Sequence, residues 1–193
     1  MTLRIMSVIA LMTSLSGCAA SPLSQIALSK MAGSATSAAT QPDQTADQKW
    51  ITLVNRGVKF QVAQLSERDG VTVWAARDGT QVFLRGSMVV GTRGFGRDLM
   101  SADVPTTPTL LEGRAHQRTY FDMDGTDTMI SHVFTCTATL KEAKDFVFGS
   151  THVVEKCLGD LGTIENTFLI LADGSVLKSR QWISQGIGYA AFD

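Results

Sequence analysis

The stretch VTVWAARDGTQVFLRGSMVVGTRGFGRDLM, residues 71–100, decides the fold. Its segments 71–77, 80–85 and 87–92 are rich in β-branched and aromatic residues, and such short runs are typical of β-strands. Asp78-Gly79 lies between the first two segments, and this dipeptide tolerates the positive φ of a tight hairpin turn. The stretch therefore predicts antiparallel strands joined by short turns.

The same turn signal recurs along the rest of the chain, at Asp69-Gly70, Asp124-Gly125 and Asp173-Gly174. Further strands are predicted at 58–65, 116–122, 127–139, 150–157, 163–171 and 175–184. Only two segments favour a helical turn, 97–103 and 140–145. We therefore expect a mainly β protein: a single antiparallel β domain, arranged as a curved sheet, a sandwich or a partial barrel, with few short helices.

The N-terminus has the pattern of an export signal. Arg4 precedes an apolar segment, 5–15, that is too short to span roughly 30 Å of hydrocarbon. The run Leu15-Ser16-Gly17-Cys18 follows it and resembles the lipobox of bacterial lipoproteins. We predict a signal peptide at 1–17 and attachment of diacylglycerol to the Cys18 thiol, with palmitate as a label for the lipid. An ordinary secretory signal with an incidental cysteine is the alternative.

Several acyl chains would anchor the protein to a membrane without crossing it, because each buried methylene contributes about 0.8 kcal/mol. In enteric-type sorting an aspartate after the cysteine favours the inner membrane. Ala19 stands there, so the resemblance implies the outer membrane and a periplasm-facing protein. Residues 18–48 are rich in Ala, Ser, Thr and Gln and predict a lipidated flexible tether. The folded β domain is expected over 49–193.

The net charge bears on the class of partner, and the cysteine content agrees with a location in the periplasm. The formal net charge of −1 gives no reason to expect a nucleic-acid partner. Cys136 and Cys157 remain once Cys18 carries lipid, and an even pair in an oxidising periplasm predicts a disulfide. Two buried thiols or a metal pair are the alternatives, although no C-x-x-C or H-x-x-x-H spacing supports a zinc site.

The 71–100 stretch and the C-terminal segment together resemble the YjbF/GfcB family of lipoproteins, which are associated with exopolysaccharide and group 4 capsule operons. The resemblance is carried by Trp74, Gly79, Gly86, Gly94, Gly96, Asp98, Leu99, Gln181 and Gly186. It implies a non-enzymatic accessory role in exopolysaccharide or capsule secretion or assembly, with the polysaccharide or secretion-machinery proteins as partners. The pair Cys136 and Cys157 departs from the family pattern.

The run Asp122-Met123-Asp124-Gly125-Thr126 also matches the DxDGT nucleophile loop of haloacid-dehalogenase-type phosphatases. Those enzymes need the loop at the end of a parallel strand in an α/β sheet, so the hairpin pattern favours a simple turn. A Ca²⁺ loop of Asp122, Asp124 and Asp127 is a second alternative, but it lacks the EF-hand pattern. We expect no enzymatic activity, no cofactor and no metal.

The remaining polar residues have ordinary structural interpretations. Gly91, Gly94 and Gly96 are expected to let the backbone turn tightly, and His116, His132 and His152 to be solvated or hydrogen-bonded strand residues. The arginines in the middle of the chain are expected to be ordinary surface charges, and a sheet face that pairs with an acidic sugar is the alternative. These arginines are Arg77, Arg85, Arg93, Arg97, Arg114 and Arg118.

A carrier of lipid or lipoprotein is the alternative function of another class. Its curved sheet would enclose an apolar ligand. A closed, dry pocket lined by Trp74, Phe83 and Trp182 would favour it.

Overall fold

The computed structural model of the chain describes residues 47–142 and 149–193. The predicted signal peptide at 1–17, the lipid-attachment residue Cys18 and the predicted tether as far as residue 46 lie outside the described residues. The end of the predicted helical turn at 140–145 lies outside them too.

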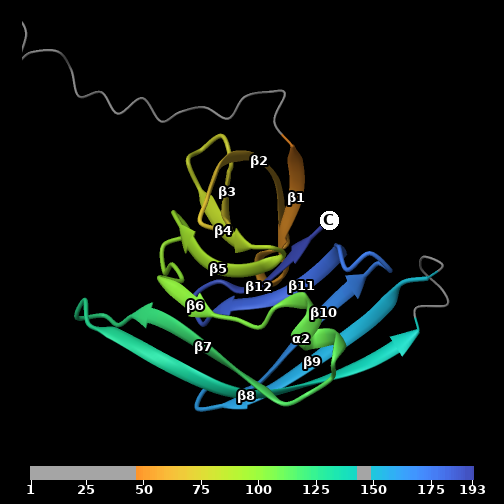
Figure 1. Cartoon of the computed structure of the whole chain (residues 1–193). Coiled ribbons are helices and arrows are strands. Elements are labelled where there is room, and N and C mark those ends of the chain that lie inside the picture. The colour runs from red at the N-terminus through yellow and green to blue at the C-terminus, as the bar shows by residue number, and fades with distance from the viewer. Residues whose placement is uncertain (1–46, 143–148) are drawn as a thin grey trace, which may run out of the picture. The chain divides into compact units, whose positions relative to one another are not determined.

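Twelve strands form a single sheet in the part of the chain that the structure describes (Figure 1). Their order in the sheet is β5-β4-β3-β2-β1-β12-β11-β10-β9-β8-β7-β6, and every neighbouring pair is antiparallel. The strands are β1 Gln48–Leu53, β2 Val58–Arg68, β3 Val71–Ala75, β4 Gln81–Arg85, β5 Met88–Arg93, β6 Ser101–Asp103, β7 His116–Met123, β8 Met129–Glu142, β9 Thr151–Gly159, β10 Gly162–Ile170, β11 Val176–Ser184 and β12 Gly188–Phe192. The mainly β, antiparallel prediction is confirmed.

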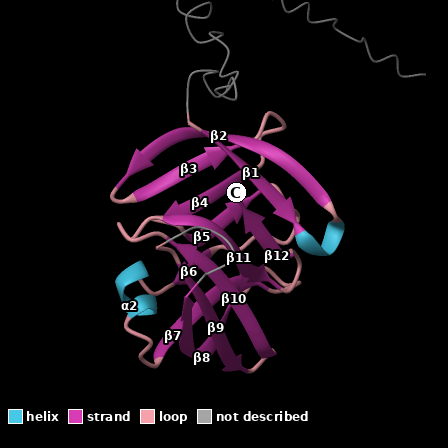
Figure 2. Cartoon of the chain, turned by 90° about the vertical axis from the view of Figure 1, so that its right-hand side faces the viewer, coloured by secondary structure: helices cyan, strands magenta, loops and turns pink. Residues whose placement is uncertain are grey.

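The sheet curls until its two edge strands meet. β5 and β6 lie side by side (Figures 1 and 2), and the Thr92 N–H donates a hydrogen bond to the Leu99 carbonyl at 2.9 Å. The result is a nearly closed, barrel-like sheet. Such closure protects edge strands that would otherwise present unpaired backbone groups.

All four Asp-Gly pairs form the hairpin turns that the sequence predicts, but by two mechanisms. Asp69 and Gly70 both have positive φ, 52° and 73°, as a type I′ turn requires. In the β7–β8 hairpin the left-handed residue is instead Asp127, with φ 58°. There the carboxylate of Asp124 accepts hydrogen bonds from the backbone N–H groups of Thr126 and Thr128 at 2.7 and 2.9 Å.

The expected helical turns are wrong wherever the structure describes them. Residues 97–100 form no helix, Ser101–Asp103 is strand β6, and residues 140–142 continue strand β8. Within residues 47–142 and 149–193 the helices are the 3₁₀ turn η1, Val54–Arg56, and α2, Thr107–Leu111. The Thr106 side chain caps α2 and a proline stands in its first turn, so this helix has its own local signals.

Alternation along β8 decides which side chains fill the interior. His132, Phe134, Cys136 and Ala138 are buried, whereas the residues between them are exposed. Helix α2 covers one part of this interior, because Leu110 is fully buried against a cluster formed by Met88, Ala138, Val153, Phe168 and Ile170. Burial of one such leucine stabilises the fold by roughly 1.5–3 kcal/mol.

Candidate functional site

The residues after β5 form a loop that is organised by Asp98. Its carboxylate accepts hydrogen bonds from the Thr92 hydroxyl at 2.9 Å and from the backbone N–H groups of Gly94 and Phe95 at 2.8 and 3.1 Å. Gly94 and Gly96 have φ of 91° and 99°, in the left-handed region that favours glycine. Leu99, which closes the loop, is fully buried. These residues of the 71–100 stretch therefore hold one another in a single shape.

This loop packs directly on the turn between β11 and β12. The Ser184 hydroxyl donates a hydrogen bond to the Arg97 carbonyl at 3.3 Å. A Cβ on Gly186 would overlap the Cβ of Arg97, so only glycine allows the two backbones to approach this closely. The structure thus brings Gly186 to the loop of Gly94, Gly96, Asp98 and Leu99, which lies far from it in the sequence.

Gln181 connects the same two regions inside the sheet. Its side chain is 1% exposed, and its amide donates to the Ser87 carbonyl at 2.7 Å and accepts from the Val89 N–H at 3.1 Å. Trp74 belongs to the hydrophobic core, whereas Gly79 and Gly86 supply the positive φ of the hairpin turns around β4. These motif residues therefore serve the fold.

A pocket of about 210 Å³ opens beside the loop, against the β7–β8 hairpin. We call it the hairpin pocket. Its polar lining comes from Arg97, Asp98, Asp122, Asp124, His132, Ser184 and Gln185. Asp122 and His132 each also have one fully buried side-chain atom without a hydrogen-bond partner, Oδ1 and Nε2 respectively, and these are the two such atoms in the described residues.

Two pKa values change around the hairpin pocket: that of Asp122, through burial, and that of Asp160, a further carboxylate that is hydrogen-bonded to His132. Burial raises the pKa of Asp122, and the nearby His132 acts in the opposite direction. His132 Nδ1 lies 2.6 Å from Asp160 Oδ2, and this hydrogen bond lowers the pKa of Asp160. A carboxylate of lowered pKa accepts hydrogen bonds, so the His132 Nδ1 carries the proton.

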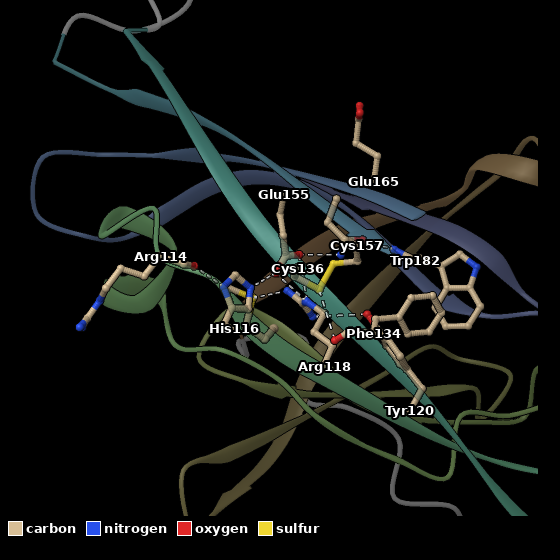
Figure 3. Close-up of a disulfide and its surroundings, with 12 residues drawn as sticks. Arg114, His116, Arg118, Tyr120, Phe134, Cys136, Glu155, Cys157, Glu165 and Trp182 are labelled. Carbon is tan, nitrogen blue, oxygen red and sulfur yellow. Dashed lines mark hydrogen bonds and ion pairs between the residues drawn. A yellow bond between two sulfur atoms is a disulfide. The ribbon is translucent and has the colours of Figure 1, made fainter. Parts of the chain in front are cut away.

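A second set of polar residues, the interior cluster, lies on the inner side of the curled sheet and contains Arg118 and Glu155 (Figure 3). The Arg118 Nε donates to both Glu155 oxygens at 2.9 Å, and both side chains are at most 1% exposed. The Asn166 amide donates to Glu155 at 2.7 Å and accepts from the Trp182 N–H at 2.7 Å. Because every charge is paired and hydrogen-bonded, the interior tolerates these residues.

His116 completes the interior cluster. Its Nε2 lies 2.6 Å from Glu155 Oε1, and its Nδ1 lies 2.9 Å from the Arg114 carbonyl. The hydrogen bond to Glu155 raises the pKa of His116, although burial acts against it. Burial likewise works to raise the pKa of Glu155, but hydrogen bonds from His116 and the charge of Arg118 outweigh it and hold that pKa below its usual range.

Cys136 and Cys157 form a disulfide between neighbouring strands β8 and β9, which confirms the predicted pairing. The rings of Tyr120, Phe134 and Trp182 pack beside it, with the Tyr120 and Trp182 centroids 4.7 Å apart (Figure 3).

Among the described residues, His116, Cys136 and Glu155 form the one group with metal-ligand spacing. This group does not fit a metal ion, because the sulfur is bonded to Cys157 and the carboxylate to Arg118.

Several predicted roles can now be compared with their positions. His116 and His132 are hydrogen-bonded strand residues, as expected. For Arg118 the surface-charge prediction and its sugar-facing alternative are both wrong, because this side chain is buried and paired with Glu155. The other arginines of this group are exposed, as expected of surface charges, namely Arg77, Arg85, Arg93, Arg97 and Arg114.

The carrier alternative gains no support from its aromatic residues, since Trp182 packs on other rings of the core. Sequence reasoning missed Glu155 and Asn166. The alternation of Val153, Glu155 and Cys157 along one strand is the signal that would have placed this carboxylate in the interior.

Comparison with known proteins agrees with this fold. Residues 22–192 match a family described as "Group 4 capsule polysaccharide lipoprotein gfcB, YjbF". Among solved structures, the hypothetical lipoprotein YmcC from Escherichia coli K12 is similar, with a TM-score of 0.65 and 15% identity over 75% of this chain and 84% of that chain. At this identity the likeness concerns the fold alone. No curated protein matches the chain.

Proposed function

The chain belongs to the YjbF family of group 4 capsule polysaccharide lipoproteins, and from this membership we propose an accessory role in secretion or assembly of an exopolysaccharide or capsule. In this proposal the protein is held in the outer membrane by lipid on Cys18, faces the periplasm and catalyses no reaction. The observation that carries it is the family match over residues 22–192, directly after an N-terminal segment with a lipobox.

The lipid anchor is supported by the sequence around Cys18. None of the helices in the described part of the chain is long and apolar enough to cross a membrane. Ala19, rather than aspartate, follows the cysteine, which supports the outer membrane as the destination.

A non-catalytic role is supported by how the polar residues are engaged. Glu155, the carboxylate buried deepest in the sheet, has both oxygens bound by Arg118 and Asn166. Asp98 and Asp124 use their oxygens to hold backbone N–H groups of their own loops. The DxDGT run lies in a hairpin of a wholly antiparallel sheet, whereas the phosphatase chemistry uses an α/β scaffold.

Cell fractionation with labelled palmitate tests the anchor. We expect the wild type to carry label and to fractionate with the outer membrane, and Cys18→Ser to remain unlabelled, because serine offers no thiolate for lipid transfer. Ser16→Ala is the matched control, since it keeps the thiol and a small residue, and should be labelled like the wild type. Equal label on wild type and Cys18→Ser would contradict the anchor. Unchanged polymer export after deletion of the gene would contradict the accessory role.

A further inference from the structure

A groove of about 240 Å³ opens on the outer side of the sheet, across the neighbouring strands β9, β10, β11 and β12 (Figure 1). We call it the outer groove. Two rows of cross-strand neighbours form most of it, Thr167, Arg180 and Ala191 in one row and His152, Leu169 and Lys178 in the next. Phe168 and Ser179 alternate with these residues and are buried, and Phe168 packs with Leu110 in the interior. The two rows therefore belong to the side of the sheet that faces away from the interior.

The floor of the outer groove is apolar and small. Leu169 is only 7% exposed although it stands on the outer side, and Ala191 is half-buried. The volume is below the roughly 300–1,000 Å³ of drug-sized sites, so the groove suits one ring rather than a long acyl chain. A sugar ring presents C–H groups on its faces and hydroxyl groups around its edge. Such a ring can pack on this floor while its polar groups reach the rim.

Lysines at one side of the groove share a single carboxylate. The Lys178 Nζ lies 3.6 Å from Asp193 Oδ1, and the Lys59 Nζ lies 3.5 Å from Asp193 Oδ2. Both lysines are exposed, and exposed ion pairs contribute little to stability. A carboxylate thus already fits beside Lys178, and a ligand carboxylate can join or replace it there.

Arg180 is held in position without a carboxylate partner. Its guanidinium carbon lies 3.6 Å from the centre of the Tyr189 ring, and its Nη1 donates to the Glu165 carbonyl at 3.4 Å. The Glu165 carboxylate pairs with Lys156 instead. Among the described residues no carboxylate forms an ion pair with Arg180. A guanidinium has five N–H donors, so donors remain for a ligand.

Charge separates an acidic sugar from other small ligands. The side chains of Lys59, Lys178 and Arg180 are positive at this rim, against the one carboxylate of Asp193. A cation would meet this excess of positive charge, and a neutral sugar would leave it uncompensated. A sugar carboxylate compensates it and matches the planar donors of arginine.

We propose that the outer groove binds one acidic sugar unit, with its ring on Leu169 and Ala191 and its carboxylate paired with Lys178 and Arg180. That this unit belongs to an exported polysaccharide rests on the proposed function. The binding of a uronate itself does not.

Saturation-transfer NMR on the lipidated protein, in a non-ionic polyoxyethylene detergent, tests the groove. The probes are the methyl glycosides of glucuronate and galacturonate, each matched with its neutral counterpart, methyl glucoside or methyl galactoside. Each pair differs only in a carboxylate that replaces a hydroxymethyl group. We expect at least one uronide to bind at least threefold more tightly than its neutral counterpart at low salt, and high salt to reduce this preference because ions screen exposed charges. Phosphate and hexanoate are the competing arms.

Variants test the residues of the groove one by one. Arg180→Gln and Lys178→Gln each remove one cation and should weaken uronide binding about three- to fivefold, as loss of an exposed ion pair does. Ala191→Leu keeps every charge and fills the floor, so it should weaken uronide binding at least threefold. Lys156→Gln is the matched control, because Lys156 is an exposed lysine that pairs with Glu165 and does not line the groove. It should bind like the wild type.

Three results would overturn the proposal: no uronide binds more tightly than its neutral counterpart, Lys156→Gln weakens binding as much as Lys178→Gln, or phosphate or hexanoate binds and no uronide does. Should Arg180→Gln fail to fold, the exposed Lys178→Gln decides the role of charge. Loss of polymer export in a deletion strain, together with absent uronide binding, overturns the groove alone and leaves the accessory role standing. Uronide binding without any export defect on deletion does the reverse.

Discussion

The side-chain oxygen of Gln181 on β11 accepts a hydrogen bond from the backbone N–H of Val89 on β5, at 3.1 Å. These strands are not neighbours in the sheet. The amide nitrogen of the same side chain donates to the Ser87 carbonyl at 2.7 Å. One buried glutamine therefore satisfies two backbone groups at the start of an edge strand and holds that strand over the interior.

Gln181→Leu should destabilise the protein by about 2–3 kcal/mol, because the buried Val89 N–H loses its acceptor while the apolar replacement gains little. Urea unfolding measures the change. Gln117→Leu, at an exposed position of β7, is the control and should change the free energy of unfolding by less than about 0.5 kcal/mol. Equal effects of the two substitutions would show that the interior amide bonds contribute nothing.

Loss of the Cys136–Cys157 disulfide should cost about 3 kcal/mol, since the bond joins residues that are 21 apart in the sequence and restricts the unfolded chain. Thermal unfolding with and without reductant should show a Tm lower by several degrees after reduction. The unfolded, unreduced protein should have no free thiol from this pair. Two reactive thiols per chain from Cys136 and Cys157 would contradict the pairing.

The interior cluster should contribute fully to the free energy of unfolding only within a certain range of pH. The pKa of His116 is raised above its ordinary 6.5, chiefly by the hydrogen bond to Glu155, so the stability that it contributes is full below pH 6.5 and is lost as pH rises through the raised pKa. Burial tends to raise the pKa of Glu155, but its partners hold it below the ordinary 4.5. The Glu155 contribution is therefore full above pH 4.5 and is lost as pH falls through the lowered pKa.

Urea unfolding at pH 5.5 and pH 8.5 tests the His116 side of this window. The wild type should lose stability between the two values, and His116→Asn should lose less, because an amide does not titrate. The comparison with the variant isolates His116 from the other histidines. The same decline in both proteins would mean that His116 is not charged in the folded state.

Local signals predicted the strands, and long-range contacts explain what those signals missed. Asp69-Gly70 and the alternation along β8 act within a few residues, so the hairpins could be predicted from them. The meeting of β5 with β6 and the bonds of Gln181 join residues that are as many as 94 positions apart, and no local pattern encodes them.

The segment 97–103 shows the same limit at one place. A helical turn was expected there after the glycines, but the Asp98 carboxylate accepts hydrogen bonds from backbone N–H groups of its own loop, and Ser101–Asp103 pair with β7. The pairing of Arg118 with Glu155 likewise depends on strand register, which the sequence does not reveal. The disulfide could be predicted, because an even pair of cysteines in an oxidising compartment is sufficient to expect one.

Asp122→Asn tests whether Asp122 is a hairpin-turn residue or a phosphatase nucleophile. The free energy of unfolding should change by less than about 1 kcal/mol, in the stabilising direction at pH 7 because burial raises the pKa of Asp122 and so disfavours its charged form. Purified wild type should hydrolyse no generic phosphomonoester with Mg²⁺. Steady hydrolysis that disappears in Asp122→Asn would reinstate the phosphatase, since an amide cannot form the aspartyl-phosphate.

The most direct measurement is the amount of surface polysaccharide made by a deletion strain that is complemented with single variants. Wild type and Ser16→Ala should restore the polymer, and Cys18→Ser should not, although immunoblots detect the protein, because the accessory role depends on a lipid-anchored domain at the membrane. Full restoration by Cys18→Ser, or a deletion strain with undiminished polysaccharide, would contradict the account.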